Sequence, residues 1–351
     1  MAAALETGRI AADVLERFSA DLLAAGGFAP DHARETAAML VWANLRGIDS
    51  HGVLRIPRYV EMVELGLINP GADIRRVAGR GAVCVIDADQ APGAVAMNVA
   101  TATAIGQARD HGVGWCVVRK ITHAGAIGFY AEKVAKAGLV AMVMTASKPL
   151  MIYHGARAEG VSTNPLAIAA PTADPDCPLV FDMSTASVAA GKITAAKDAG
   201  RAIPLGWAVD AEGRETTDPV QVKAVLPMAG PKGTGLSLMI EVLASVLVGN
   251  PLIAQALNGS KEPGGNGVVV ALDPEAFGAA GHFAEDVSAL AAAVKALPPA
   301  AGTPAVLLPG ERGNGERDRR LVSGIPIAKG TAARLTALAG KLGVAVPAEL
   351  A

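Results

Sequence analysis

Hydrophobic and polar positions alternate along the chain in segments of two kinds. Over residues 31–45 the apolar positions recur at helical spacing, and Gly47 stands where a left-handed cap would end a helix. A second helix is predicted over 56–65, because Pro57 suits its first turn. The polar segment 46–52 therefore forms a connector between two helices, a place where functional residues concentrate.

From about residue 75 short apolar runs alternate with longer helical patterns. The predicted strands cover residues 83–86, 113–118, 139–145, 166–170, 179–181, 268–272 and 306–308. The predicted helices cover residues 95–109, 128–137, 187–198, 235–248, 284–296 and 331–341. Since no repeat or low-complexity linker separates these segments, we expect an α/β body with the terminal helices packed on it.

Composition removes several classes of function. The formal charge of -2 gives no global attraction to nucleic acid or to an anionic membrane. No uninterrupted apolar run has the roughly 18 residues that a membrane span needs, and the N-terminal segment resembles neither a secretory nor a transit signal. Three cysteines without CxxC spacing do not suggest a disulfide framework. We expect a soluble, cytoplasmic protein.

Phosphate binding would need a site other than the usual one for dinucleotides. No Gly-x-Gly-x-x-Gly sequence stands between a predicted strand and a predicted helix. The best candidate is the segment 230–235, Gly-Pro-Lys-Gly-Thr-Gly, where backbone amides, a helix dipole and Lys232 are expected to converge. Segments of this composition are common at helix starts, so the segment alone is a weak indication.

Two histidines in loops are candidates for proton transfer. His51 and His123 each join predicted elements, and histidine titrates close to neutral pH. Arg55 follows His51 by about one helical turn and has the fork that grips a carboxylate at two points. Each histidine taken alone is as often an ordinary surface residue, and Arg55 taken alone is more often a surface charge. No metal-ligand spacing and no Gly-x-Ser-x-Gly elbow occurs, so neither a metal site nor a serine hydrolase is expected.

Seven segments in order resemble those of the type-2 malate/L-lactate dehydrogenase family, from about residue 9 to residue 327. This family includes ureidoglycolate, sulfolactate and diketogulonate oxidoreductases and some cyclic ketimine reductases. The segments are Arg46-Gly47-Ile48-Asp49-Ser50-His51-Gly52, Thr122-His123-Ala124-Gly125-Ala126-Ile127-Gly128, Thr163-Asn164-Pro165-Leu166, Phe181-Asp182-Met183-Ser184, Gly206-Trp207-Ala208-Val209-Asp210, Gly230-Pro231-Lys232-Gly233 and Pro309-Gly310-Glu311.

The resemblance implies a fold and an activity. It implies an α/β protein with a non-Rossmann NAD(P)-binding domain over residues 75–309 and a helical domain built from residues 1–74 and 310–351. It also implies a homodimer. The activity would be hydride transfer between NAD or NADP and a small 2-hydroxy or 2-oxo acid of the malate, lactate, ureidoglycolate or sulfolactate type.

The resemblance also implies roles for single residues. His51 lies where the family has a proton donor, with Ser50 beside it, and His123 lies where the ureidoglycolate enzymes have their proton acceptor. Arg55 and Thr163 match positions that hold the substrate. The implied cofactor contacts are Ser147, Asp182, Met183, Ser184, Lys232, Pro309, Gly310 and Glu311.

Departures from the family pattern leave alternatives open. Ser162 replaces a usual glycine, Thr234 stands where larger residues are common, and the stretch 257–268 looks short. Lys192 falls near a position where ketimine reductases carry Asp, which favours a hydroxy acid over the runner-up substrate, a cyclic 2-imino acid. A catalytically inactive scaffold is the third reading. The choice between NAD and NADP stays open.

Overall fold

A seven-stranded sheet forms the centre of the computed structural model, which describes residues 6–198, 200–260, 264–279 and 281–350. The strands, in spatial order, are β2 (Arg75–Ala78), β3 (Val83–Asp87), β4 (Val113–Ile121), β12 (Gly265–Leu272), β5 (Val140–Ser147), β8 (Leu166–Ala170) and β9 (Leu179–Met183). Only β3 and β4 pair in parallel. The sheet is therefore mixed and not of the Rossmann type, which confirms the predicted fold class.

Helices cover both faces of this sheet. α4 (Gly93–His111) and α5 (Gly128–Lys136) pack on one face, and α7 (Pro231–Ala244) packs on the other. The central strand β12 shows why this arrangement suits the sequence, because Val269 and Ala271 face α4 and α5 while Val268 and Val270 face α7. A strand buried on both faces has to be continuously apolar, as this one is.

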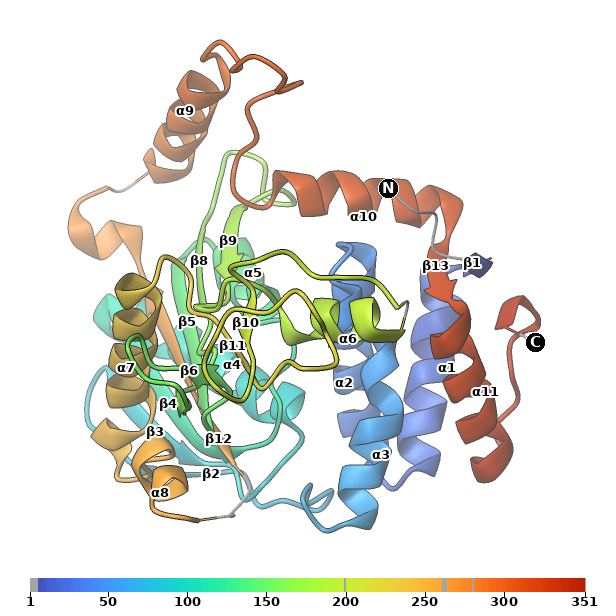
Figure 1. The fold of residues 1–351 in the computed structure, drawn as a ribbon. Coiled ribbons are helices and arrows are strands. Elements are labelled where there is room, and N and C mark those ends of the chain that lie inside the picture. Colours follow the sequence, from blue (N-terminus) through green and yellow to red (C-terminus); the bar gives the residue numbers. More distant parts are fainter. Residues whose placement is uncertain (1–5, 199, 261–263, 280, 351) are drawn as a thin grey trace.

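A layer of helices from both ends of the chain lies beside the sheet (Figure 1). It consists of α1 (Ala12–Ala25), α2 (Pro30–Leu45), α3 (Ile56–Glu64) and α11 (Lys329–Leu342), with α10 (Glu311–Ser323) crossing one end. The strands β1 (Glu6–Ile10) and β13 (Ile325–Ala328) pair antiparallel. One hydrophobic cluster spans this layer, α4, α5 and one face of the sheet, so the terminal helices pack on the body as predicted. The domain boundaries at residues 74 and 309 stay a prediction.

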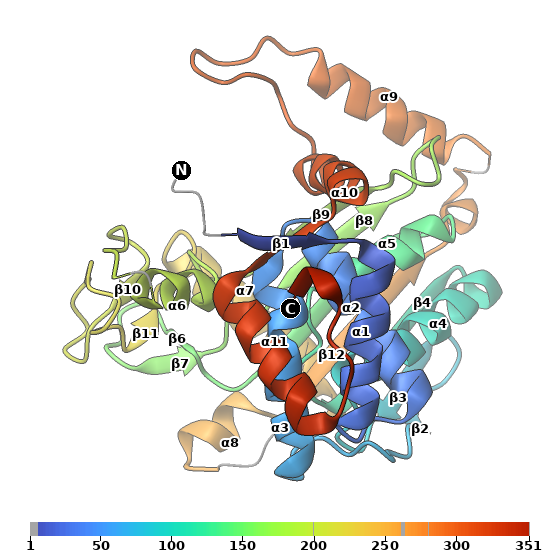
Figure 2. The ribbon, with the colours of Figure 1, turned by 90° about the vertical axis from the view of Figure 1, so that its right-hand side faces the viewer.

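Smaller elements surround the body. A four-stranded sheet has the order β10 (Ala208–Val209), β11 (Ala224–Val225), β6 (Met151–Ile152) and β7 (Glu159–Val161). The short helices are α6 (Ala190–Asp198) and α8 (Ile253–Leu257), and the 3₁₀ turns are η1 (Asp49–His51), η2 (Val53–Arg55), η3 (Val246–Val248), η4 (Pro274–Phe277) and η5 (Ala348–Leu350). Helix α9 (Phe283–Lys295) projects away from the body in two perpendicular views (Figures 1 and 2).

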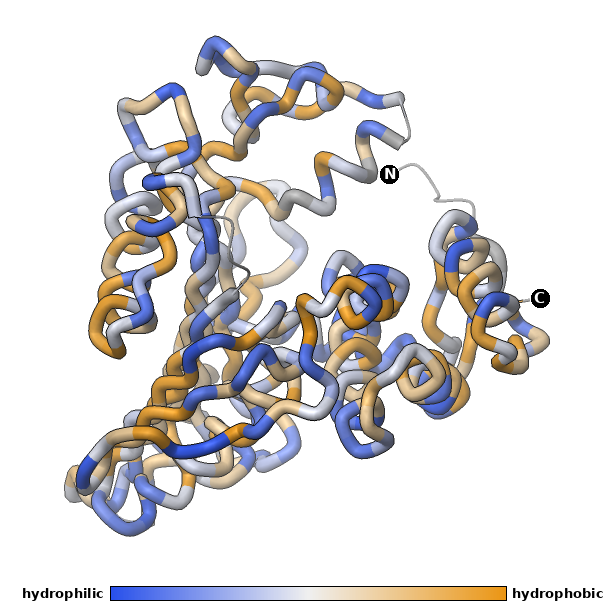
Figure 3. Tube along the Cα trace, turned by 90° about the horizontal axis from the view of Figure 1, so that it is seen from below, coloured by the Kyte–Doolittle hydropathy of each residue, from blue (hydrophilic) through white to orange (hydrophobic). Residues whose placement is uncertain are grey.

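Apolar positions are distributed over many elements, which alternate between hydrophobic and hydrophilic residues along their length (Figure 3). Among the described residues, one segment, Pro231–Val248, is long and apolar enough to cross a membrane by length and composition. Its mean hydropathy is 1.3 and 39% of it is buried, and helices packed inside a protein core meet the same criteria.

Most predicted elements are present within a few residues of their expected bounds, with two clear errors. The predicted strand at 306–308 is wrong, because these residues form a loop whose end docks on β9 through the Val180 N–H and the Pro309 carbonyl, 3.4 Å apart. The predicted helix 235–248 begins earlier, at Pro231, and ends in a 3₁₀ turn. Part of the stretch 257–268, which looked short, lies outside the described residues.

Candidate active site

The loop that carries His51 is organised by one asparagine. Gly47, with a φ of 72°, ends α2, and the chain then enters η1 and η2. Asn44 Nδ2 donates to Asp49 Oδ1 at 2.6 Å, and Asn44 Oδ1 accepts the Val53 N–H at 2.8 Å. A Cβ at Gly52 would lie 2.1 Å from Asn44 Oδ1. Only glycine fits at that position, so the segment from Gly47 to Gly52 is fixed by local geometry.

An arginine from the C-terminal part of the chain holds the same loop. Arg320 on α10 donates from Nη1 and Nη2 to the two carboxylate oxygens of Asp49, at 2.8 and 3.2 Å. Its Nη1 also donates to the Asn44 carbonyl at 2.5 Å. The arginine is 7% exposed, and a two-point contact of this kind fixes orientation as well as distance. The position of His51 therefore depends on α10.

The two candidate histidines lie next to each other. The rings of His51 and His123 are stacked, with centroids 5.6 Å apart and planes 22° from parallel. Ser50 Oγ lies 3.0 Å from His51 Nδ1, and Arg55 Nε donates to the Ser50 carbonyl at 2.8 Å. Within the described residues the terminal nitrogens of Arg55 have no protein acceptor, so they are available to a ligand carboxylate.

A tyrosine that the sequence did not single out orients the second histidine. Tyr59 Oη lies 2.6 Å from His123 Nδ1, and the tyrosine is 5% exposed. Burial raises the pKa of Tyr59, so the phenol keeps its proton at neutral pH. Its O–H has no other acceptor among the described residues, and it therefore donates to Nδ1. In this tautomer the Nε2 atom of His123 carries the ring proton.

Both imidazoles are neutral at pH 7. Burial and the nearby Arg55 charge lower the pKa of His51 to about 4. The same causes, together with the His51 ring, lower the pKa of His123. His51 is half-buried, whereas more than a third of the surface of His123 is exposed, so solvent screens part of the effect at His123. Strongly perturbed pKa values that cluster in one place are typical of functional sites.

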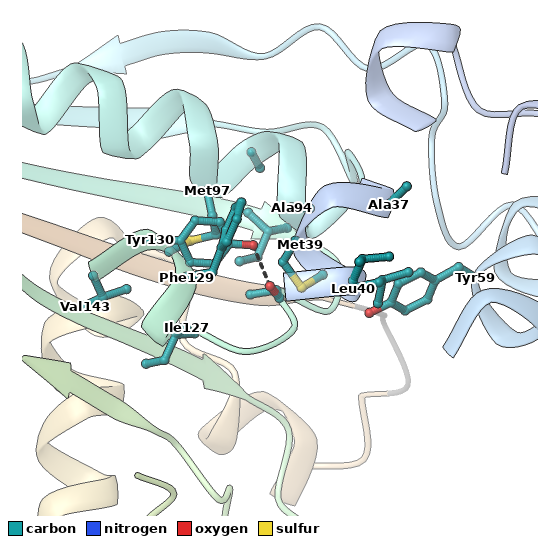
Figure 4. Close-up of a cluster of buried hydrophobic side chains, with 14 of the residues drawn as sticks. Ala37, Met39, Leu40, Tyr59, Ala94, Met97, Ile127, Phe129, Tyr130 and Val143 are labelled. Atoms are coloured by element: carbon teal, nitrogen blue, oxygen red, sulfur yellow. Dashed lines mark hydrogen bonds between the residues drawn. The ribbon is translucent and has the colours of Figure 1, made fainter. Parts of the chain in front are cut away.

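The loop from His123 to Gly128 is anchored in the hydrophobic core (Figure 4). Tyr130, fully buried on α5, donates its O–H to the Ala124 carbonyl at 2.6 Å. Gly125 has a φ of 75°, and a Cβ there would lie 2.3 Å from Met39 Sδ on α2. The backbone of this loop is therefore set by contacts with α2 and α5 that are independent of any ligand.

One predicted cofactor residue is joined directly to this loop. Asp182, at the end of β9, accepts the Gly128 N–H through Oδ2 at 2.9 Å. Desolvation of the carboxylate by the surrounding protein raises the pKa of Asp182 to about 6, and the hydrogen bond from Gly128 opposes the rise. More than a third of the residue is exposed, which leaves its other oxygen able to meet a ligand. Asp182 thus links the predicted cofactor segment to the His123 loop.

The strand ends beside Asp182 bring together the other predicted hydroxyl residues. Ser184 Oγ donates to the Thr163 carbonyl at 3.2 Å. Ser147 Oγ lies 2.6 Å from the buried Ser162 Oγ, and the Ser147 N–H donates to Asn164 Oδ1 at 3.1 Å. These contacts join β5, β8 and β9 at one edge of the sheet, with Met183 half-buried between them. The serine at position 162 therefore supports Ser147 rather than lining open space.

Lys232 does not stand among free backbone amides at a helix start, as the sequence had suggested. It lies inside the first turn of α7, exposed, and within the described residues it forms no ion pair. The amides expected to bind phosphate are already used, because Lys232 N–H and Gly233 N–H donate to the carbonyls of Ala229 and Met228. The tight turn at Ala229 and Gly230, with φ values of 47° and 59°, directs those carbonyls back to the helix. The ammonium, and not the helix start, is the free cationic group.

The turn from Pro309 to Glu311 lies at the opposite end of β9. A Cβ at Gly310 would lie 3.0 Å from the Val180 carbonyl, so this turn packs closely on the strand. Glu311 forms an ion pair with Lys295 and accepts the Leu308 N–H at 2.9 Å, and Lys295 lowers its pKa.

The residues at hand fit a bound dinucleotide. Asp182 and Met183 lie at the end of β9, and Ser184 follows them. The Pro309 turn packs near the start of the strand, and beyond its end the Thr185 carbonyl accepts the Met228 N–H at 2.9 Å, four residues before Lys232. The exposed Lys232 ammonium, the half-buried hydroxyls of Ser147 and Ser184 and the Asp182 carboxylate are donors and acceptors of the kind that phosphates and ribose hydroxyls need. The Pro309 turn packs near the other end of β9, so the predicted cofactor residues extend along the whole strand, which suits an elongated ligand.

Known proteins match this chain over nearly its whole length. The family model for malate/L-lactate dehydrogenase matches residues 10–336. A ureidoglycolate dehydrogenase (NAD(+)) of Escherichia coli is 35% identical over 325 residues, 91% of this chain and 92% of that protein. A Delta(1)-pyrroline-2-carboxylate/Delta(1)-piperideine-2-carboxylate reductase of Pseudomonas syringae pv. tomato is 35% identical over 323 residues, covering 90% and 91% of the two chains.

A solved structure agrees with these matches. The malate dehydrogenase of Pyrococcus horikoshii OT3 superposes with a TM-score of 0.87 at 31% identity, over 97% of each chain. The family match and the shared fold make the chain an oxidoreductase on a mixed, non-Rossmann sheet. The chain belongs to the malate/L-lactate dehydrogenase family and is a hydroxy-acid dehydrogenase that works with a nicotinamide cofactor.

Proposed function

We propose that this protein moves a hydride between NAD or NADP and the carbon next to the carboxylate of a small 2-hydroxy or 2-oxo acid. The observation that carries the proposal is the pair of stacked, neutral histidines beside an arginine whose terminal nitrogens are free. A hydroxyl that is oxidised must lose a proton to a base within hydrogen-bond reach, and Arg55 can hold the neighbouring carboxylate at two points.

Hydrogen bonding favours His51 as the group that exchanges the proton. Tyr59 donates to Nδ1 of His123, so the Nε2 atom of His123 already carries a proton and serves as a donor. The Ser50 hydroxyl is able to accept from Nδ1 of His51, which leaves the Nε2 atom of His51 free to take the hydroxyl proton. In the reverse direction protonated His51 returns it. His123 then either binds the substrate oxygen or forms part of the wall of the site.

The remaining residues bind and orient. Thr163, whose hydroxyl has no partner in the described part of the chain, is proposed to contact the substrate next to Arg55. Residues Ser147, Asp182, Met183, Ser184, Lys232, Pro309, Gly310 and Glu311 are proposed to hold the cofactor along β9. When bound there, the nicotinamide supplies hydride transfer at the carbon next to the carboxylate.

Reduction of a cyclic 2-imino acid is the second candidate function. It needs the same carboxylate and hydride geometry, and one relative with 35% identity carries that activity in its name. A spectrophotometric panel of 2-hydroxy acids, 2-oxo acids and cyclic ketimines with NADH, NADPH and their oxidised forms separates the two. Turnover confined to ketimines would refute the hydroxy-acid proposal. Absence of NADH and NADPH binding by fluorescence would instead indicate an inactive scaffold.

We also propose a homodimer. α7 and η3 expose apolar side chains at Leu238, Met239, Val242, Val246 and Leu247, the projecting α9 exposes Leu290, and Leu297 is exposed just after its end. Apolar surface concentrated on neighbouring elements marks an association site, and a second copy is the partner that every preparation contains. Sedimentation equilibrium should give twice the chain mass of 35.4 kDa, and Met239→Glu with Leu247→Glu should give the single mass. A monomeric parent would refute the proposal.

A further inference from the structure

A buried acid that the proposed mechanism does not use lies on α5. Glu132 is 4% exposed, and both oxygens of its carboxylate meet donors. Oε2 accepts the indole N–H of Trp42 at 3.0 Å and an N–H from Nη2 of Arg46. Oε1 forms an ion pair with Lys136 Nζ at 2.9 Å. A carboxylate this deeply buried is retained in a folded protein only when such partners compensate its lost hydration.

Two of these donors come from the end of α2, where the His51 loop begins. Trp42 lies in the last turn of α2, and Arg46, one helical turn later, is the first residue after the helix. The guanidinium of Arg46 lies over the Trp42 ring, 4.6 Å from its centroid, and Arg46 is also buried. The cation and the indole therefore hold Glu132 Oε2 together, at the point from which the chain continues to His51.

The helix that carries Glu132 also anchors the loop of the second histidine. α5 begins where that loop ends, and Tyr130 on α5 donates to the Ala124 carbonyl at 2.6 Å (Figure 4). Glu132 follows Tyr130 by two residues. One carboxylate therefore joins the helix that anchors His123 to the residue from which the His51 loop starts.

The contact beside this carboxylate is apolar and less directional. Trp42 packs edge-on against Phe129 of α5, with ring centroids 5.7 Å apart. Aromatic contacts of this kind allow a range of geometries, whereas a charge-assisted hydrogen bond fixes both distance and direction. A buried ion pair adds little net stability over apolar residues of the same volume, so the contribution of Glu132 is to select one arrangement of α2 on α5.

We propose that Glu132 is a positioning residue for proton transfer, which sets the spacing of His51 and His123 through the two segments that carry them. The two rings are stacked with centroids 5.6 Å apart, although they come from segments far apart in the sequence. A displacement of about 1 Å between these segments would move the base away from the reacting oxygen. This inference rests on the proposed function, in which the two histidines exchange and donate the proton.

Glu132→Gln tests the inference, because it keeps the shape of the side chain and removes its charge. With the best 2-hydroxy acid we expect kcat to fall about ten- to a hundredfold, since a shift of roughly 1 Å at a reacting group has an effect of that size. The Kd of NADH, measured by fluorescence, should stay within about twofold of the parent value, because the proposed cofactor residues lie outside this link.

A measurement on the rings themselves separates positioning from a general loss of packing. The chain has six histidines, and proton–carbon NMR spectra of protein labelled at the histidine rings resolve their signals. His51→Asn and His123→Asn assign the two signals of interest. Because stacked rings shift each other's signals, those of His51 and His123 should move in Glu132→Gln, while those of the other histidines stay.

Two control variants are matched to this one. Lys136→Ala removes a partner of the same carboxylate that belongs to α5 itself, so it should change neither kcat nor the histidine signals. Glu241→Gln removes the charge of another buried glutamate, 3% exposed on α7, which accepts the N–H groups of Leu252 and Ile253 at 2.7 and 2.9 Å. It should lower the melting temperature and leave kcat and the histidine signals unchanged.

A milder variant covers the case in which Glu132→Gln does not fold. Trp42→Phe removes one donor to Oε2 and keeps an aromatic ring, so it should move the same two signals and lower kcat at least about twofold. Unmoved signals, an unchanged kcat, or equal effects in Glu241→Gln would overturn the inference and leave the proposed function standing. A parent that binds NADH but turns over no 2-hydroxy or 2-oxo acid would overturn the proposed function, and the histidine signals would still show whether Glu132 sets the spacing of the rings.

Discussion

Replacement of Tyr59 by phenylalanine removes one oxygen from the site and almost nothing else. The lost contact is the 2.6 Å hydrogen bond to His123 Nδ1, between two neutral groups. Such a bond contributes about 1 kcal/mol, and the exposed part of His123 lets water replace the lost donor, so the full penalty of a buried unpaired atom does not apply. We expect kcat/KM to fall about fivefold. Since Nδ1 can then take the ring proton, Nε2 of His123 becomes a second base.

The assay is a pH–rate profile for oxidation of the best 2-hydroxy acid, with Tyr130→Phe as the matched control. Tyr130 makes a hydrogen bond of the same length, 2.6 Å, but to the Ala124 carbonyl rather than to a titrating ring. Its loss should lower the melting temperature, because a buried carbonyl is left unpaired at a cost of about 1 to 3 kcal/mol. It should leave the pH profile unchanged. Tyr59→Phe should move the acid limb.

A Tyr59→Phe profile equal to that of the parent would show that the tautomer of His123 does not depend on the phenol, and His51 would no longer be favoured for proton exchange. If both tyrosine variants move the acid limb equally, the effect comes from displacement of the loop and not from the tautomer of His123.

Four further substitutions test the proposed roles. Because the pKa of His51 is lowered to about 4, oxidation by the parent should keep its kcat/KM from pH 8 down to about pH 5 and fall below that as the base becomes protonated. His51→Asn should depress kcat and remove this limb, while His123→Asn mainly raises KM; profiles with the opposite pattern reverse the assignment. Arg55→Lys keeps the charge but loses the two-point contact, so kcat/KM should fall at least about tenfold on every acid, and a variant equal to the parent would place Arg55 outside the site. Lys232→Ala should weaken NADH binding by about 1 to 3 kcal/mol in fluorescence titration, and unchanged affinity would exclude Lys232.

The sequence predicted helices and strands well where a single pattern of apolar residues runs through the whole segment. The helices around residues 31–45 and 56–65 and the apolar strand at 268–272 are close to their expected bounds because packing and periodicity agree there. It could not predict that β12 lies between β4 and β5, since that order comes from pairings more than a hundred residues apart. Helix α10 escaped notice because its charged sequence has no apolar periodicity.

The residues of the candidate site also divide into those that the sequence identified and those that it missed. His51, His123 and Arg55 could be chosen from residue type and resemblance, and the structure brings all three together. Tyr59 gave no signal, because an aromatic residue on the buried side of α3 looks like an ordinary core residue until its oxygen meets His123. The backbone amides at the start of α7 were expected to be free, but in the structure they donate to carbonyls of the tight turn before Pro231.

The contact between Arg320 and Asp49 explains why the two ends of the chain belong to one functional unit. These residues are 271 positions apart, yet the arginine binds both oxygens of the carboxylate in the His51 loop. Closing a loop of that length costs only a few kcal/mol more than closing a short one, and the pairing of β1 with β13 shares the cost by joining the same two ends. Arg320 is buried and Asp49 is half-exposed, so the two-point contact fixes the orientation of the loop more than it adds stability. The geometry around His51 therefore rests on α10 as well as on the local contacts of Asn44 and Gly52, so the proposed active site depends on both ends of the chain.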